Sequence, residues 1–233
     1  MAKAILSPLL EKGEYDANNV FGVVGNVASV SQVLRELPKG VRVVSSKDSA
    51  SKEAWTAPLK LLAIKPQQFA DIKEPVLNFE ASEQFPKPLL ISVLAGVNLR
   101  TLQESFPSHT CVRAVPNTPS FIGEGLTGLS WGDEITSGQK SLVKKIFEPI
   151  SKIFELPEHQ LDAFLALTSS GPAYIALVVE AMSDGAVASG LPRNLSNQLA
   201  CKTLSGTASL LIKKDLHPAE LKDMVASPGG TTI

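Results

Sequence analysis

Residues 227–232 combine the residue types that hold a small anion. They read Ser-Pro-Gly-Gly-Thr-Thr, with glycines at Gly229 and Gly230. Glycines leave the backbone open, so successive amides can point at one negative charge, and the hydroxyls of Ser227, Thr231 and Thr232 are further donors. A carboxylate or a phosphate suits this arrangement. An ordinary surface turn has the same composition, so both interpretations stay open.

Three more segments place lysine, small residues or an amide directly after an apolar run. The segments are residues 61–67, 91–96 and 113–119. If the runs are parallel strands, their ends meet at the sheet edge where open α/β folds bind ligands. There the Lys65 stem can lie along a nucleotide, small residues such as Ala95 admit a cofactor, and the Asn117 amide can bond a carboxamide. A solvated lysine, a helix contact and a rigid turn are the simpler alternatives.

Two other patterns look catalytic but have simpler explanations. Ser169 and Ser170 have no nearby histidine and no nucleophile elbow, so helix capping is the better interpretation. The three histidines, His109, His159 and His217, are scattered without ligand spacing. We therefore expect no metal site.

Composition excludes several functional classes. Apolar residues make up 44% and charged residues 19% of the 233 residues, which is typical of a globular protein. The net charge of -1 argues against a nucleic-acid partner. Cys111 and Cys201 are too few for a disulfide framework, which favours the reducing cytoplasm. No apolar run or leader pattern indicates a membrane or secreted protein.

The first two-thirds of the chain alternate apolar runs with amphipathic stretches. This pattern predicts a Rossmann-type, doubly wound, mainly parallel sheet covered by helices on both faces. The expected strands are residues 20–24, 41–44, 61–64, 89–93 and 111–115, and the expected helices are residues 27–37, 99–105 and 137–147. Two later apolar runs are residues 126–131 and 153–156.

From about Pro157 the pattern becomes helical. Residues 172–188 carry only Glu180 and Asp184 as charges, which predicts a helix that is covered on all sides. Two more helices are expected, from Pro192 to about Lys214 and over residues 218–226. We expect an incomplete dinucleotide-binding domain at 1–157 and a helical dimerisation and substrate domain at 158–233. The second is too small to cover its own apolar surface, which indicates a homodimer or larger homo-oligomer.

Both ends of the chain are unusual for this fold. A dinucleotide-binding domain starts with a strand and a Gly-rich turn, but here the predicted helix at residues 1–11 comes first. At the other end, the turn chemistry of residues 227–233 is not followed by the helix that it should cap. We expect that a first strand with its turn, and a C-terminal helical end, are missing.

Taken together, these segments resemble the pyrroline-5-carboxylate reductases. The matching stretches are AIKPQ (63–67), ISVLAGV (91–97), VRAVPNTPSFIGEGLT (112–127), SSGPAY (169–174), DGAVASGLPR (184–193) and HPAELKDMVASPGGTTI (217–233). They occur in the family's order and spacing and cover essentially the whole chain. Val115 and Ser169 depart from the family, in which methionine and glycine are common at these positions.

The resemblance implies reduction of 1-pyrroline-5-carboxylate to L-proline with hydride from NADPH. It places Ala63, Lys65, Pro66, Ala95 and Asn117 beside the cofactor. It places Ser227, Gly229, Gly230, Thr231 and Thr232 around the substrate, with Thr232 donating to the imine nitrogen. It also implies that helices of a partner subunit complete the pocket.

The choice of cofactor depends on the end of the second strand. An enzyme that uses NAD has an acidic residue there, whereas this chain has Gly25 and Asn26. The missing acid favours NADPH, with Asn26 beside the ribose, although NADH stays possible. Two alternatives to the reductase remain. One is another imine or hydroxyacid reductase of this architecture, and the other is a fragment that folds and dimerises without binding a cofactor.

Overall fold

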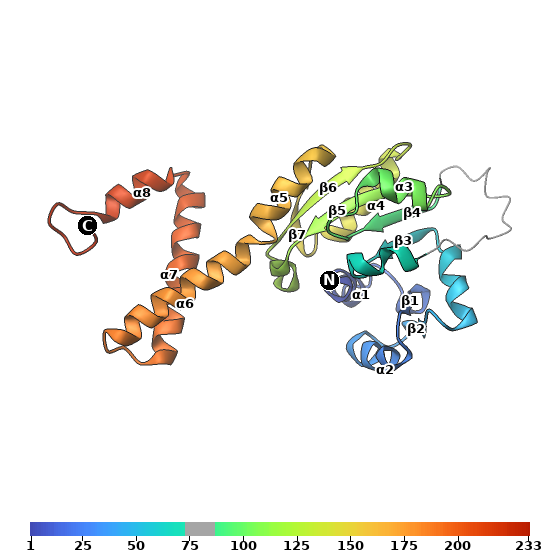
Figure 1. The fold of residues 1–233 in the computed structure, drawn as a ribbon, viewed down its shortest axis with the longest axis horizontal. Helices are drawn as coiled ribbons and strands as arrows, with labels where there is room; N and C mark the ends of the chain where they lie inside the picture. Colours follow the sequence, from blue (N-terminus) through green and yellow to red (C-terminus); the bar gives the residue numbers. More distant parts are fainter. Residues whose placement is uncertain (73–86) are drawn as a thin grey trace. The chain divides into compact units, whose positions relative to one another are not determined.

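The apolar runs that predict strands all form strands in the computed structural model, which describes residues 1–72 and 87–233 (Figure 1). The strands are β1 (Phe21–Val24), β2 (Arg42–Ser45), β3 (Leu59–Leu62), β4 (Leu89–Ser92), β5 (Thr110–Pro116), β6 (Gly125–Trp131) and β7 (Ser151–Glu155). The five expected strands are confirmed, with ends shifted by a few residues. The two later apolar runs form β6 and β7.

The strands form two sheets. One has the order β1-β2 and the other has the order β3-β4-β5-β6-β7. Every pair is parallel except β5 with β6. The mainly parallel sheet is therefore confirmed, but it is divided. The first element of the described chain is the helix α1 (Ala2–Glu11).

Helices cover both faces of the larger sheet. Successive strand residues point to opposite sides, so each face has apolar side chains for a helix to cover. Leu89 and Ile91 of β4 share a buried cluster with Ile5 of α1 and Phe147 of α4, whereas Leu90 packs with a second cluster that contains α3. The helices after α1 are α2 (Val27–Glu36), α3 (Leu99–Ser105), α4 (Ser137–Phe147) and α5 (Leu161–Thr168). Short 3₁₀ helices are η1 (Ala17–Asn19), η2 (Ser49–Thr56), η3 (Pro66–Asp71), η5 (Thr118–Ile122) and η6 (Glu158–Gln160).

A buried histidine in the α3 cluster should make stability depend on pH. His109 lies edge-on to Trp55 and Phe106, and burial, followed by the charge of Lys60, lowers its pKa from 6.5 to about 4. As pH falls, the unfolded chain binds this proton before the folded chain does. The contribution of neutral His109 to stability is therefore present above pH 6.5 and is lost toward pH 4.

We expect the melting temperature of the wild type to fall more steeply than that of His109→Gln between pH 6.5 and pH 4. Thermal unfolding of both proteins over this range measures the difference. A constant gap between the two melting temperatures would show that His109 does not titrate in this window.

Contacts divide the chain into two units, Met1–Ser170 and Gly171–Ile233. Residues 158–170, which the sequence analysis grouped with the helical domain, fall in the first unit because α5 packs on β6. The second unit contains α6 (Gly171–Ala188), α7 (Arg193–Lys214) and α8 (Pro218–Val225). In it, α6 packs on α7, and Asp184 of α6 pairs with Arg193 at 2.5 Å.

The helices of the second unit expose much of their apolar surface. Large apolar side chains that are at least 40% exposed include Tyr174, Ile175, Leu177, Val178 and Met182 on α6 and Leu195 and Leu199 on α7. This agrees with the expectation that the unit cannot cover its own apolar surface. Some other surface must cover it.

The expectation that no stretch is long and apolar enough to span a membrane is wrong. The helical stretch Glu158–Ala188 meets both criteria by length and composition, with a mean hydropathy of 1.4 over its most apolar window, of which 6% is buried. The reason is that no charged residue occurs between Asp162 and Glu180. One such helix is weak support for a membrane span, because an apolar helix that a protein partner covers has the same composition.

Candidate functional site

The predicted cofactor residues meet at the carboxyl edge of the larger sheet. Parallel pairing places Leu62 of β3 opposite Ser92 of β4, which in turn lies opposite Arg113 of β5. The segments that follow these strands therefore emerge at one edge, which we call the nucleotide edge. It carries Ala63, Lys65 and Pro66 after β3, Ala95 after β4 and Asn117 after β5.

The turn after β3 presents an exposed lysine. Pro66 starts η3 directly after the strand region, so the chain changes direction at Lys65, and both residues are exposed. Ala95 is also exposed, and the next residue, Gly96, has φ of +75°, which few residues other than glycine adopt. The edge thus combines an accessible cation with small residues that admit close approach to the backbone.

The end of β1 joins the same region. A Cβ placed on Gly25 would lie 3.8 Å from the Gln68 side chain of η3, so the turns after β1 and β3 are neighbours. Asn26 begins α2, and its Oδ1 accepts a hydrogen bond from the Ala28 N–H at 3.0 Å. An exposed helix N-terminus without a carboxylate suits a phosphate group.

Asn117 is placed differently from its neighbours at this edge. Its side chain is 5% exposed, accepts a hydrogen bond from the Leu126 N–H at 2.8 Å and donates one to the Thr168 carbonyl at 3.0 Å. The sequence gives no signal for either partner, because they lie far away along the chain. A ligand at the nucleotide edge would therefore meet the backbone around Asn117 and not a free side-chain amide.

The predicted substrate residues form a turn in the second unit. After α8, the Gly230 N–H donates to the Ser227 carbonyl at 2.9 Å, and Gly229 has φ of +67°. Gly229 therefore needs the backbone freedom of glycine. Thr231 and Thr232 are exposed, so their hydroxyls are accessible to a ligand.

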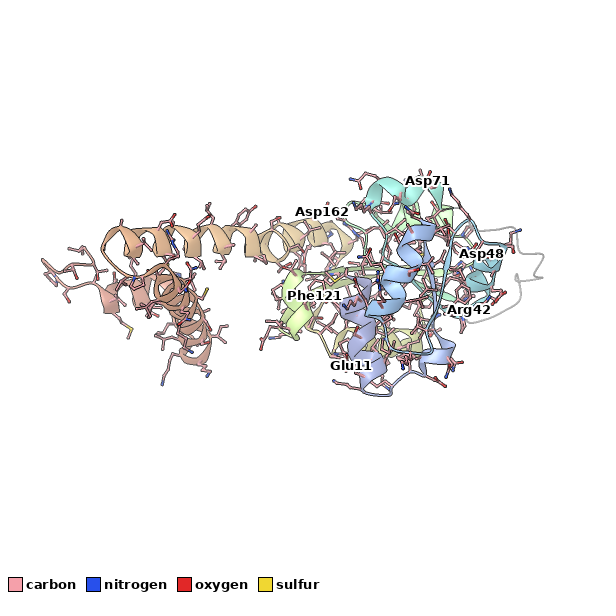
Figure 2. The ribbon with its side chains drawn as sticks, turned by 90° about the horizontal axis from the view of Figure 1, so that it is seen from below. Glu11, Arg42, Asp48, Asp71, Phe121 and Asp162 are labelled. Atoms are coloured by element: carbon pink, nitrogen blue, oxygen red, sulfur yellow. The ribbon has the colours of Figure 1, made fainter. Side chains whose placement is uncertain are left out.

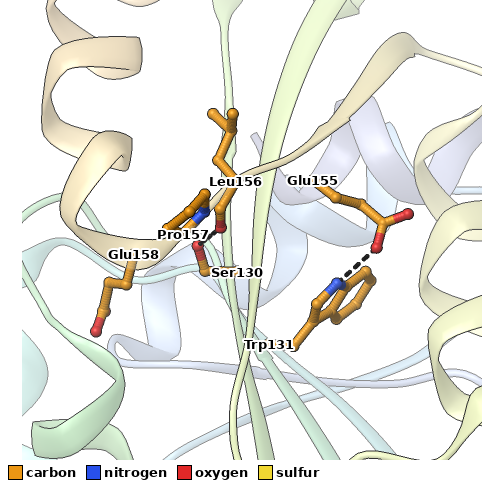
Figure 3. A pocket seen from close by; sticks show the side chains of 6 residues that line it. All are labelled: Ser130, Trp131, Glu155, Leu156, Pro157 and Glu158. Atoms are coloured by element: carbon orange, nitrogen blue, oxygen red, sulfur yellow. Dashed lines mark hydrogen bonds between the residues drawn. The ribbon is translucent and has the colours of Figure 1, made fainter.

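A hollow of about 310 Å³ lies elsewhere in the first unit (Figure 3). Its lining residues are Ser130, Trp131, Glu155, Leu156, Pro157 and Glu158. Trp131 pairs with Val112 near the start of β5, so the hollow lies away from the end of β5 that carries Asn117. Lys144 and Trp131, which donates at 2.8 Å, lower the pKa of Glu155 by hydrogen bonding. Because its carboxylates are internally paired, the hollow is not a good candidate for the reaction site.

Known proteins resemble this chain over its whole length. Pyrroline-5-carboxylate reductases of Synechocystis and Thermus thermophilus are 38% and 35% identical to it, and each match covers 100% of this chain and 84% of the relative. The chain belongs to the pyrroline-5-carboxylate reductase family. A family model described as pyrroline-5-carboxylate reductase dimerisation matches residues 158–233.

Solved members of the pyrroline-5-carboxylate reductase family share this fold. The Coxiella burnetii enzyme has 30% identity and a TM-score of 0.80, and the match covers 99% of this chain and 83% of that one. The Plasmodium falciparum enzyme, solved with NADP bound, has 27% identity and a TM-score of 0.81 over 98% of this chain and 81% of that one. These similarities confirm the Rossmann-type domain followed by a helical domain.

The dimerisation match also bears on the apolar helices. It includes α6 and α7, whose side chains form the exposed apolar surface. A second copy of the chain accounts for this surface without a membrane, because subunit interfaces bury apolar side chains in the same way. The match supports the predicted homo-oligomer.

Proposed function

We propose that this protein reduces 1-pyrroline-5-carboxylate to L-proline with NADPH, the last step of proline biosynthesis. The observation that carries the proposal is the family match over all 233 residues. The nucleotide edge supports it, because the ends of three adjacent strands bring an exposed lysine and small residues together. The low number of cysteines, Cys111 and Cys201, suits a reducing compartment such as the cytoplasm.

The residues at the nucleotide edge fit the cofactor. Lys65 and the α2 N-terminus at Asn26 offer positive charge to its phosphates, while Ala63, Pro66 and Ala95 line its path without bulk. When bound, NADPH supplies the hydride. The side chains at this edge orient the cofactor and need no chemistry of their own.

Residues 227–232 fit the substrate. The backbone around Gly229, with the hydroxyls of Ser227 and Thr231, offers donors for the substrate carboxylate, while the Gly230 N–H holds the turn closed on the Ser227 carbonyl. Hydride addition to the C=N carbon leaves an electron pair on nitrogen, which must take a proton. The Thr232 hydroxyl is the hydrogen-bond donor that we assign to this nitrogen, and the proton comes from solvent. An imine that arrives already protonated instead donates its N–H to the Thr232 oxygen.

Cofactor titration tests the proposal and the role of Asn26. We expect the wild type to bind NADPH about tenfold more tightly than NADH, and Asn26→Asp to reverse this preference, because a carboxylate holds ribose hydroxyls but repels a 2′-phosphate. The variant keeps the oxygen that caps α2. Cofactor fluorescence measures both dissociation constants.

Asn26→Ser is the matched control, because it keeps a capping oxygen without adding charge. It should retain the preference for NADPH. If the wild-type chain bound neither cofactor, the second candidate function, a dimerising fragment without cofactor, would replace the reductase.

A further inference from the structure

The Asn117 side chain connects three elements at the nucleotide edge. Asn117 follows β5 and begins η5. Its side chain forms hydrogen bonds with Leu126 at the start of β6 and with Thr168 at the end of α5. The two partners lie 9 and 51 residues away along the chain. With 5% of its surface exposed, this side chain offers little area to a ligand.

Helix α5 is fixed on the same region of the sheet by two further contacts. Arg113 of β5 pairs at 2.8 Å with Asp162 of α5, which is labelled in Figure 2. Gly128 of β6 leaves no room for a side chain, because an added Cβ would lie 2.9 Å from both Leu161 and Phe164 of α5. The first two turns of α5 are therefore held by Arg113 and Gly128.

The last residue of α5 is held by Asn117. A helix ends with carbonyl groups that lack a partner within the helix, and the Asn117 amide supplies a donor to the carbonyl of Thr168. The Thr168 hydroxyl donates to the Phe164 carbonyl at 2.8 Å, so it takes no part in this contact. Consequently Ser169 and Ser170, which follow α5, start from a point that is fixed to the end of β5.

Ser169 adds an independent observation. Its Oγ is buried and has no hydrogen-bond partner among the residues that the structure describes. A buried hydroxyl without a partner is unfavourable unless water or a ligand satisfies it. Ser169 directly follows Thr168, whose carbonyl accepts the hydrogen bond from Asn117.

We propose that Asn117 is a positioning residue for the reduction. Its side chain fixes Ser169 and Ser170 at the nucleotide edge, and its amide does not bind the nicotinamide. This inference rests on the proposed function. It assigns the contact with the reacting groups to the start of the Ser-Ser-Gly-Pro segment. Asn117 itself lies beside the cofactor through its backbone only.

Two variants of Asn117 and one control test this proposal. Asn117→Asp keeps an oxygen for the Leu126 N–H but replaces the donor to Thr168 with a second oxygen. Asn117→Ser removes the reach to Thr168 without adding charge. Ser120→Ala is the matched control, because Ser120 lies in the same η5 turn, is 2% exposed, and has no partner for its Oγ within the described chain.

We expect Asn117→Asp to lower kcat/KM for pyrroline-5-carboxylate by about 10- to 100-fold, because small displacements of positioned groups are costly. The Kd for NADPH should change by less than about twofold, and Asn117→Ser should behave in the same way. Ser120→Ala should change neither quantity. Amide hydrogen exchange should become faster at Ser169 and Ser170 in both Asn117 variants only.

Two results would overturn the proposal. A tenfold rise in the Kd for NADPH with unchanged kcat at saturation would show that the Asn117 amide binds the cofactor directly. Unchanged exchange at Ser169 and Ser170 would show that Asn117 does not hold this segment. If the wild type failed to reduce the substrate, the proposed function would fall, whereas the exchange measurement would still decide whether Asn117 holds the end of α5.

Discussion

Replacing Thr232 by alanine should lower kcat with pyrroline-5-carboxylate by about 100-fold, the effect of removing one donor to developing charge. The Kd for NADPH should stay within about twofold, because the lost hydroxyl bonds the imine nitrogen and not the cofactor. The exposed position of Thr232 after the Gly229 turn leaves this hydroxyl accessible. Steady-state kinetics and cofactor titration measure the two effects separately.

Thr232→Ser is the control, because it removes a methyl group and keeps the hydroxyl. It should retain most of the wild-type turnover. Two outcomes would remove Thr232 from its role at the nitrogen: an equal loss in both variants, or a loss of NADPH affinity that exceeds the loss of turnover.

The second large effect is expected at Gly125, the first residue of β6. Its N–H donates to the Ile150 carbonyl at 3.0 Å, and a Cβ there would lie 2.7 Å from that same oxygen and 2.1 Å from the Ser120 Oγ. An alanine side chain at this position therefore pushes Ser120 of η5 and Ile150, the residue before β7, away from β6. We expect Gly125→Ala to lower the free energy of unfolding by about 3 kcal/mol or more. The melting temperature should then fall by about 6–12 °C.

Gly138→Ala is the matched control for this substitution. Gly138 lies in the first turn of α4, where an added Cβ would find its nearest neighbour, Thr136 Oγ1, at 3.9 Å. Alanine should leave stability within about 1 kcal/mol or raise it slightly, because it favours the helix. Equal melting temperatures for the Gly125 and Gly138 variants would contradict the close packing around β6.

Much of the fold was predictable because the chain has a regular pattern. Apolar runs broken by amphipathic stretches located the strands and helices, and α3 and α4 have the predicted ends, Leu99–Ser105 and Ser137–Phe147. The apolar surface of α6 followed from its low charge. Parallel pairing then brought Lys65, Ala95 and Asn117 to one edge, as expected for strands of this type.

Other features depend on contacts that a linear pattern does not contain. The antiparallel pairing of β5 with β6 and the division into two sheets depend on which edges meet. The bonds of Asn117 to Leu126 and Thr168 join distant segments, so the sequence predicted a free amide at the edge. The apolar stretch through α5 and α6 was missed because Thr168, Ser169 and Ser170 interrupt the apolar run, although they add no charge.

The proposed activity of this protein is the conversion of a cyclic imine to proline with a reduced nicotinamide. The most direct measurement is to incubate the protein with NADPH and pyrroline-5-carboxylate and to quantify both the oxidised cofactor and L-proline. We predict one proline formed for each NADPH oxidised. A protein that binds NADPH and leaves both compounds unchanged, or that oxidises it without forming proline, would contradict the account.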